Sequence, residues 1–220
     1  NKPADEQKRS LEKSFGEFGA RSMIRTLKNV CREKRGIMSL KKNVDEILKK
    51  IMQEKSSGNR PKPSEKLVSG KSKLSDKLRR ELLDIIAEIV DQNLYGRSDM
   101  CVYFAILLRD ALIKRGLPAK AILGKATYFS PDQKFTWDHG WVIFDNELID
   151  GNVDSMIENP MIPDNIHPSN YWGLIDELPK DRKFDIDKGI DEQWEKVNTE
   201  YKVLIVWRKQ LFSKIKNIET

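Results

Sequence analysis

The chain has 220 residues, of which 39% are hydrophobic and 34% are charged, so it can form one substantial domain with a heavily charged surface. No apolar run approaches the roughly 20 residues that a membrane helix needs. The two cysteines and two histidines are too few for a disulfide framework or an all-nitrogen metal site. We therefore expect no metal and no organic cofactor.

Charge divides the chain into two parts. Residues 1–80 hold 23 basic and 10 acidic side chains, a net charge of +13, whereas residues 81–220 hold 17 and 24, a net charge of −7. Such a change of sign suggests two functional regions. The basic part is suited to an acidic partner protein, an anionic membrane surface or the acidic remainder of its own chain; a merely solvated helical face is the plain alternative. Its few aromatic residues disfavour nucleic acid.

The basic part begins with a polar stretch and then turns helical. Apolar residues recur at helical spacing from Leu40 to Met52, and an earlier helix is expected over residues 21–34. Residues 56–73 are dominated by Ser, Gly, Pro and Lys, which predicts a linker. The expected organisation is a basic helical region over 1–55, this linker, and the main domain over 74–220.

The main domain is predicted to open with two helices. The first begins near Ser75 and ends between Asn93 and Gly96. Ser98 or Asp99 is a candidate N-cap for the second, over residues 100–115, and Gly116 stands where a helix-terminating glycine belongs.

Three strands are predicted next, over residues 119–129, 139–144 and 147–150, the last two joined by a hairpin turn at Asp145-Asn146. Residues 151–190 are expected to be irregular. Residues 191–218 read as mainly helical, with a strand over 203–207 as the alternative. This order predicts an α+β domain in which an antiparallel sheet packs on a helix.

Cys101 stands at the predicted start of the second helix. The positive end of the helix dipole and the unpaired backbone N–H groups there favour the thiolate, which is the reactive form of cysteine. The same N–H groups can supply half of an oxyanion hole. The apolar run after Cys101 predicts a buried helix that would hold the thiol rigidly. The plain alternative is a cysteine that only packs in the core.

His139 and Asp150 complete a candidate catalytic set. His139 opens one strand of the predicted hairpin, and Asp150 lies on the other, at a diagonal position on the same face. An imidazole there can act as general base and acid toward the Cys101 sulfur. The Asp150 carboxylate can fix the imidazole tautomer and stabilise its charged form.

Several short segments together resemble the transglutaminase-like superfamily. They are a helix-start cysteine in CVYFAILL, a helix end in GLPA, an apolar strand, HGWV and LID, covering about residues 75–155. The nearest similarity is to bacterial transglutaminase-like cysteine proteases, including the leader peptidases that mature lasso peptides. The resemblance implies a papain-like fold and a Cys-His-Asp triad, with Cys101 as nucleophile, His139 as base and Asp150 as the residue that orients it.

The sequence departs from the family pattern at three points. Asp138 precedes His139 where the family often has Gly or Ala, and a carboxylate there would raise the histidine pKa. Gly151 and Asn152 follow Asp150, so Asp154 is an alternative to it. The upstream oxyanion residue is not identified; the candidates are Gln92, Asn93 and Tyr95.

The expected function is hydrolysis or acyl transfer on peptide or protein amides through a thioester, as in proteases, glutamine deamidases and transglutaminases. The alternative is a catalytically inactive module of the same fold that binds through its basic helices. Arylamine acetyltransferases share the Cys-His-Asp order, but their Arg-x-Gly-Gly-x-Cys motif is absent. Residues 1–10 are polar and no apolar segment typical of a secretory signal follows them, so we expect the protein in the reducing cytoplasm. Delivery into another cell as an effector or toxin is the alternative.

Overall fold

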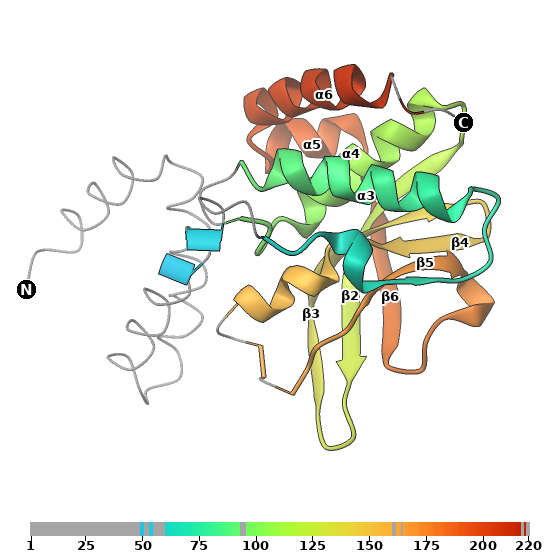
Figure 1. Ribbon diagram of the computed structural model, residues 1–220, viewed down its shortest axis with the longest axis vertical. Helices are drawn as coiled ribbons and strands as arrows, with labels where there is room; N and C mark the ends of the chain where they lie inside the picture. The colour runs from blue at the N-terminus through green and yellow to red at the C-terminus, as the bar shows by residue number, and fades with distance from the viewer. Residues whose placement is uncertain are drawn as a thin grey trace, which may run out of the picture. The chain divides into compact units, whose positions relative to one another are not determined.

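The computed structural model divides the chain into two compact units, residues 1–60 with 93–96 and residues 61–92 with 97–220. Lys49–Lys50 and Gln53–Glu54 of the first unit are helical. The helix expected over 21–34, most of the basic region and Cys31 lie outside the described residues. The second unit, here called the sheet unit, carries all the remaining elements (Figure 1). The structure describes residues 49–50, 53–54, 60–92, 96–159, 162–163, 165–216 and 218.

A six-stranded sheet runs through the sheet unit in the order β1-β5-β4-β3-β2-β6. The edge strand β1 is parallel to β5, and every other neighbouring pair is antiparallel. The predicted α+β class is therefore confirmed, with one parallel edge added to an otherwise antiparallel sheet. The strands are β1 Leu67–Ser69, β2 Ala119–Phe129, β3 Lys134–Phe144, β4 Glu147–Asp150, β5 Asn170–Leu174 and β6 Arg182–Gly189.

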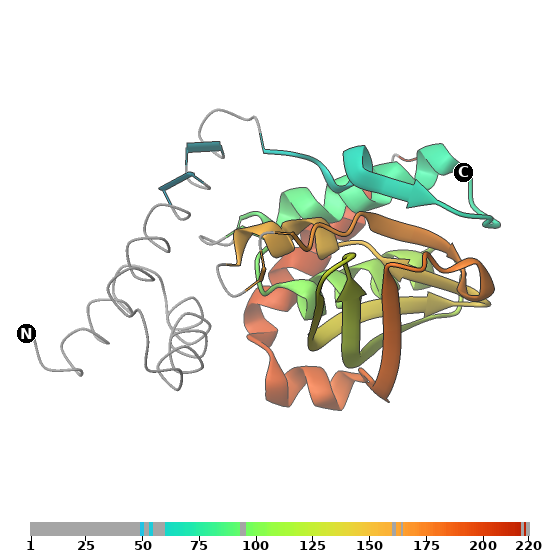
Figure 2. The ribbon, with the colours of Figure 1, turned by 90° about the horizontal axis from the view of Figure 1, so that it is seen from below.

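Helix α4 packs on strands β2 and β3, and helices α3 and α6 pack against α4 (Figures 1 and 2). The side chains of α4 are buried without a break from Tyr103 to Leu108, as expected for a helix enclosed by a sheet and two other helices. The helices are α3 Asp76–Val90, α4 Cys101–Lys114, α5 Glu192–Asn198 and α6 Tyr201–Ile215, with 3-10 turns η1 Pro63–Lys66, η2 Val153–Glu158 and η3 Ile175–Glu177.

The predicted helix signals have mixed outcomes. Ser75 caps α3, since its hydroxyl accepts a hydrogen bond from the Leu78 N–H at 3.3 Å. Gly116 takes a positive φ of 78° after α4 and lets the chain turn back, as predicted. The predicted cap at Ser98 or Asp99 is wrong, because Met100 occupies that position without a capping side chain. Helix α3 also ends earlier than predicted, at Val90.

Two stretches expected to lack regular structure contribute strands. The predicted linker 56–73 contains η1 and β1, and the sheet unit begins at Pro61 rather than at residue 74. The predicted irregular segment 151–190 contains β5 and β6. β1 is three residues long and is defined by its pairing with β5, a contact between distant segments that local composition does not encode.

Residues 203–207 belong to helix α6, so the strand alternative is wrong there. Leu204, Trp207, Leu211 and Ile215 recur at helical spacing, and all four are buried.

Candidate active site

The hairpin of β3 and β4 brings His139 and Asp150 together. Val142 pairs with Ile149, so Asp150 lies level with Trp141 and on the same face of the sheet as His139. The turn residue Asp145 adopts a positive φ of 55°, which a tight two-residue hairpin requires. His139 Nε2 lies 2.9 Å from Asp150 Oδ1, and both residues are fully buried at 0% exposed.

Strand β3 continues past the end of β4, and this leaves His139 open on one flank. Pairing with β4 covers only Val142 to Phe144, whereas pairing with β2 covers the whole of β3. Helix α4 starts close to the neighbouring Gly140. A Cβ added to Gly140 would lie 2.9 Å from Val102 Cα and 3.0 Å from the Cys101 carbonyl oxygen. The absence of a side chain at Gly140 therefore lets the helix start approach the strand that carries the histidine.

The three predicted residues act on one another electrostatically. Burial alone lowers the pKa of His139, but the charge of Cys101 and then that of Asp150 outweigh it and raise the pKa from 6.5 to about 10. Nε2 is bonded to Asp150, so Nδ1 is the nitrogen left for the sulfur. Nδ1 has no hydrogen bond of standard geometry among the described residues.

The start of α4 supplies donors as well as the thiol. The first helical hydrogen bond runs from the Phe104 N–H to the Met100 carbonyl at 2.9 Å. The N–H groups of Cys101 and Val102 therefore have no intrahelical acceptor. Cys101 itself is 8% exposed, which keeps its sulfur in a low-dielectric setting where such donors act strongly on a developing negative charge.

Two residues hold the Asp150 carboxylate, a role that the sequence predicted for neither of them. The Tyr128 hydroxyl donates to Asp150 Oδ2 at 3.0 Å, and Arg182 Nη1 donates to the same oxygen at 3.1 Å. Both side chains are buried. Tyr128 lies in a strand that was predicted, where its opposite partner is Arg182, but Arg182 opens a strand that was not. Only the sheet pairing reveals the contact.

Asp154, the alternative to Asp150, serves another purpose. Its two carboxylate oxygens accept from Arg97 at 2.8 and 2.7 Å, so the alternative is wrong. The Arg97 carbonyl accepts from Asn152 Nδ2 at 3.1 Å and from Ser155 Oγ at 3.2 Å. Arg97 thus ties the segment that precedes Cys101 to the segment that follows Asp150.

Aromatic rings line β3 on the histidine face. Trp137 stacks on His139 with ring centres 5.4 Å apart and planes at 12°, and Trp141 lies on the other side at 6.4 Å. Trp141 is fully buried, in keeping with a core role, whereas Trp137 is half-buried. The two indoles confine the imidazole ring between them.

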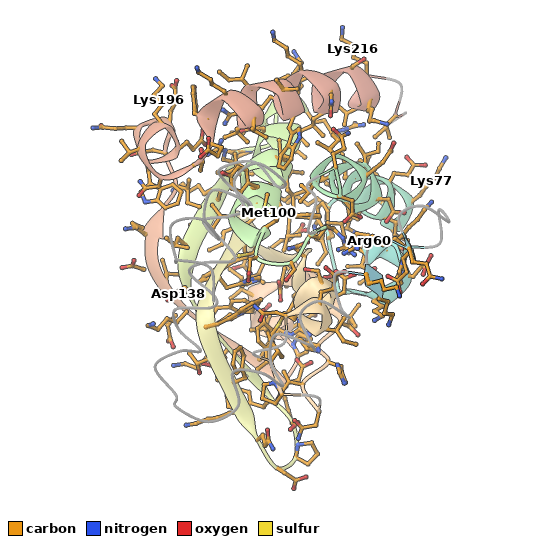
Figure 3. The ribbon with its side chains drawn as sticks, turned by 90° about the vertical axis from the view of Figure 1, so that its left-hand side faces the viewer. Arg60, Lys77, Met100, Asp138, Lys196 and Lys216 are labelled. Atoms are coloured by element: carbon orange, nitrogen blue, oxygen red, sulfur yellow. The ribbon has the colours of Figure 1, made fainter. Side chains whose placement is uncertain are left out.

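Asp138 lies on the opposite face of β3 from His139 and is exposed, at the margin of the strand (Figure 3). It pairs with Lys125 Nζ at 3.1 Å. The prediction that Asp138 raises the histidine pKa is not supported, because the raising groups are Cys101 and Asp150.

The structure supports none of the three predicted oxyanion residues. Gln92 is exposed and its amide bonds to Gln210 at 3.1 Å, while Asn93 and Tyr95 lie outside the described residues. His167 is exposed in a loop. Within the described ranges, no group of three or more His, Cys, Asp or Glu side chains could hold a metal ion. Among those same residues, none forms a helix with the length and apolar character needed to span a membrane.

No family model matches the sequence, and neither curated proteins nor solved structures give a match. The function therefore has to be inferred from the geometry of Cys101, His139 and Asp150.

Proposed function

We propose that this protein is a cysteine-nucleophile enzyme that cleaves or transfers the acyl group of peptide or protein amides, on a papain-like or transglutaminase-like core. The observation that carries the proposal is the buried imidazole, bonded to Asp150 through Nε2, on a strand whose next residue, Gly140, lies against the backbone of Cys101 and Val102 at the start of α4. The inactive alternative requires a sulfur remote from the ring, and the strong effect of Cys101 on His139 weighs against it.

The proposed reaction has two halves, formation and breakdown of a thioester, and Cys101 and His139 act in both. The Cys101 thiolate attacks the amide carbonyl carbon, and the N–H groups at the start of α4 stabilise the oxyanion that forms. The His139 imidazolium donates its proton to the leaving amine, which gives a thioester and a neutral ring. His139 then takes a proton from water or from an acceptor amine, whose attack on the thioester releases the product and the thiolate. Asp150 keeps the ring in the required tautomer throughout.

Substitution of the nucleophile tests the proposal. Cys101→Ala should abolish cleavage or deamidation of a peptide library, scored by mass spectrometry, with a loss of at least about 10⁴-fold. Its melting temperature should stay close to that of the wild type, because the change removes one small side chain. An alanine variant that retains activity would overturn the proposal.

Alkylation provides a second test that needs no substrate. In a Cys31→Ser background, Cys101 is the only thiol in the chain, so the rate of iodoacetamide labelling near pH 7 reports on it alone. Replacing His139 with Gln should slow labelling by at least about 10-fold, since the thiolate loses its cationic partner. Equal rates would mean that the imidazole does not activate the sulfur. The expected setting for such a free thiol is the reducing cytoplasm.

A further inference from the structure

The geometry points to Arg182 as a positioning residue of the site: its guanidinium shares the Asp150 carboxylate with the His139 ring and limits how strongly that carboxylate holds the imidazolium. This inference rests on the proposed function for its catalytic meaning. Asp150 Oδ1 lies 2.9 Å from His139 Nε2, whereas Asp150 Oδ2 accepts from Arg182 Nη1 at 3.1 Å. One carboxylate thus bridges two cationic groups in a buried setting.

Arg182 is itself divided between two carboxylates. Its Nε and Nη2 atoms donate to Asp181 at 2.8 and 3.0 Å, and its guanidinium carbon lies 5.7 Å from the centre of the Tyr128 ring. The side chain of Arg182 is 1% exposed, while that of Asp181 is 41% exposed. The arginine is therefore fixed in place, and its second partner can be altered from the surface without opening the core.

Four elements present charged or titratable groups to His139 or to its carboxylate partner. They are α4 with Cys101, β4 with Asp150, β2 with the Tyr128 hydroxyl, and β6 with Arg182. Cys101 and Asp150 both favour a charged ring. Arg182 is the one cation in this described set, and because it is bonded to Asp150 it offsets part of the charge of that carboxylate.

The opposition has a catalytic use. His139 must give up a proton to the leaving amine, and an imidazolium held too firmly is a poor acid. A guanidinium bonded to the same carboxylate weakens that hold. It also fixes the rotation of the carboxylate, since Tyr128 and Arg182 both hold Oδ2 and leave Oδ1 directed at the ring.

The titration of His139, followed by NMR on protein labelled with ¹⁵N-histidine, tests the inference. The chain has only two histidines, and exposed His167 serves as an internal reference. Arg182→Met should move the His139 midpoint to higher pH by about one unit, because a cation next to Asp150 is lost. Asp181→Asn should move it in the opposite direction by a few tenths of a unit, because Arg182 then acts on Asp150 alone. The His167 midpoint should not change.

Arg182→Lys serves as the matched control, since it keeps the charge and should leave the His139 midpoint near that of the wild type. If Arg182→Met does not fold, Asp181→Asn and Arg182→Lys still decide the question. A His139 midpoint that is the same in wild type and Asp181→Asn, or that rises in Asp181→Asn, would overturn the inference. No substrate is used, so shifted midpoints in a protein without activity would contradict only the proposed function.

Discussion

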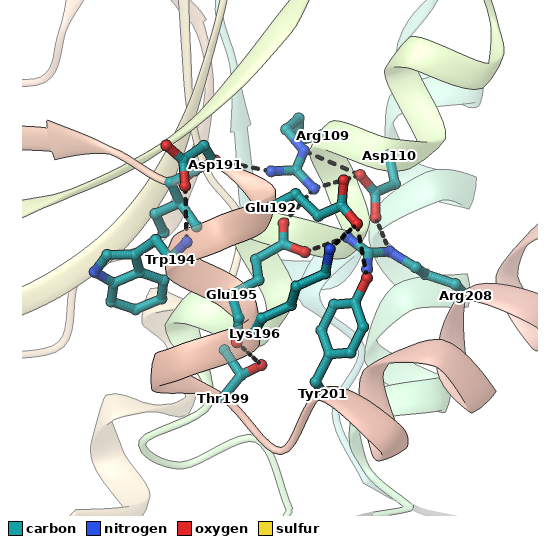
Figure 4. A network of polar contacts seen from close by, with 11 residues as sticks. Arg109, Asp110, Asp191, Glu192, Trp194, Glu195, Lys196, Thr199, Tyr201 and Arg208 are labelled. Atoms are coloured by element: carbon teal, nitrogen blue, oxygen red, sulfur yellow. Dashed lines mark hydrogen bonds and ion pairs between the residues drawn. The ribbon is translucent and has the colours of Figure 1, made fainter.

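Two clusters of buried or partly buried charges include residues of helix α4, and they differ in one respect. Toward its end, Arg109 and Asp110 form a closed ring with Glu195 of α5 and Arg208 of α6 (Figure 4). The four N···O distances around this ring are 2.6, 2.6, 2.7 and 2.6 Å. Two cations face two anions, and each side chain has a partner on both sides.

The cluster at the start of α4 is not closed. Asp150 has three partners, but His139 Nδ1 has no hydrogen bond of standard geometry within the described part of the chain. A closed ring of charges fastens helices to one another. A buried imidazole with one nitrogen anchored and the other unbonded suits the proton transfer that we propose for it instead. On the proposed function, the difference between the clusters separates a structural role from a chemical one.

One pair of matched substitutions tests this difference most directly. Glu195→Gln removes a fully buried anion from the closed ring and leaves two arginines facing one carboxylate, so it should destabilise the fold by about 3–5 kcal/mol. Near pH 9.5, where the charge of the ring contributes little, His139→Gln should cost only about 1–2 kcal/mol, because Asp150 keeps Tyr128 and Arg182. Urea unfolding gives both free energies.

The alkylation rate of Cys101 should rank the two variants in the opposite order from their stability. The folded fraction of Glu195→Gln should react with iodoacetamide at Cys101 at the wild-type rate, whereas His139→Gln should react slowly. A His139 variant as unstable as the Glu195 variant would make both clusters structural.

Gly140→Ala tests the approach of α4 to β3. The added methyl group would lie 2.9 Å from Val102 Cα and 3.0 Å from the Val102 nitrogen, so the helix start must shift. We expect the free energy of unfolding to fall by about 1–3 kcal/mol. The alkylation rate of Cys101 in the folded protein should also fall, because the thiol is displaced from His139. Gly116→Ala, at a positive φ with no atom within 4 Å, is the control: it should cost stability but leave the alkylation rate unchanged.

The sequence was sufficient to predict the strands around His139 and Asp150, because the local signals there are strong. The strand over 119–129 and the hairpin end over 147–150 have the predicted bounds, and the level of Asp150 opposite Trp141 follows from the turn at Asp145-Asn146. The period-2 register of a tight hairpin fixes which side chains share a face, so a diagonal His139–Asp150 contact was within reach of sequence reasoning.

Long-range pairing was beyond that reasoning. Arg182 meets Asp150 because β6 pairs with β2, although Arg182 is 32 positions from Asp150 and opens a strand of charged residues with few apolar ones. Asp154 looked interchangeable with Asp150 until Arg97 was seen to hold it. Neither contact has a local sequence signal, because each is set by the packing of segments far apart in the chain.

The pH dependence of stability should distinguish the open cluster as well. The folded pKa of His139, about 10, lies above the ordinary 6.5, so its charge stabilises the fold fully below about pH 6.5. That contribution is lost as the pH rises toward 10. The free energy of unfolding of the wild type, measured in urea, should therefore fall toward that of His139→Gln between pH 6.5 and 9.5. A constant difference between the two proteins would mean that the ring is neutral in the folded state.

The smallest effect is expected at Asp138, the nearest carboxylate to His139 in sequence. Its side chain is 68% exposed, pairs with Lys125 at the surface and lies on the face of β3 away from the imidazole. Asp138→Asn should change stability by less than about 1 kcal/mol and leave the His139 titration where it is. Asp150 is one of the two charged residues that raise the pKa of His139. Asp150→Asn should therefore lower the midpoint of the His139 titration. Equal shifts in the two variants would show that proximity in sequence, rather than the shared face of the sheet, governs the charge on the ring.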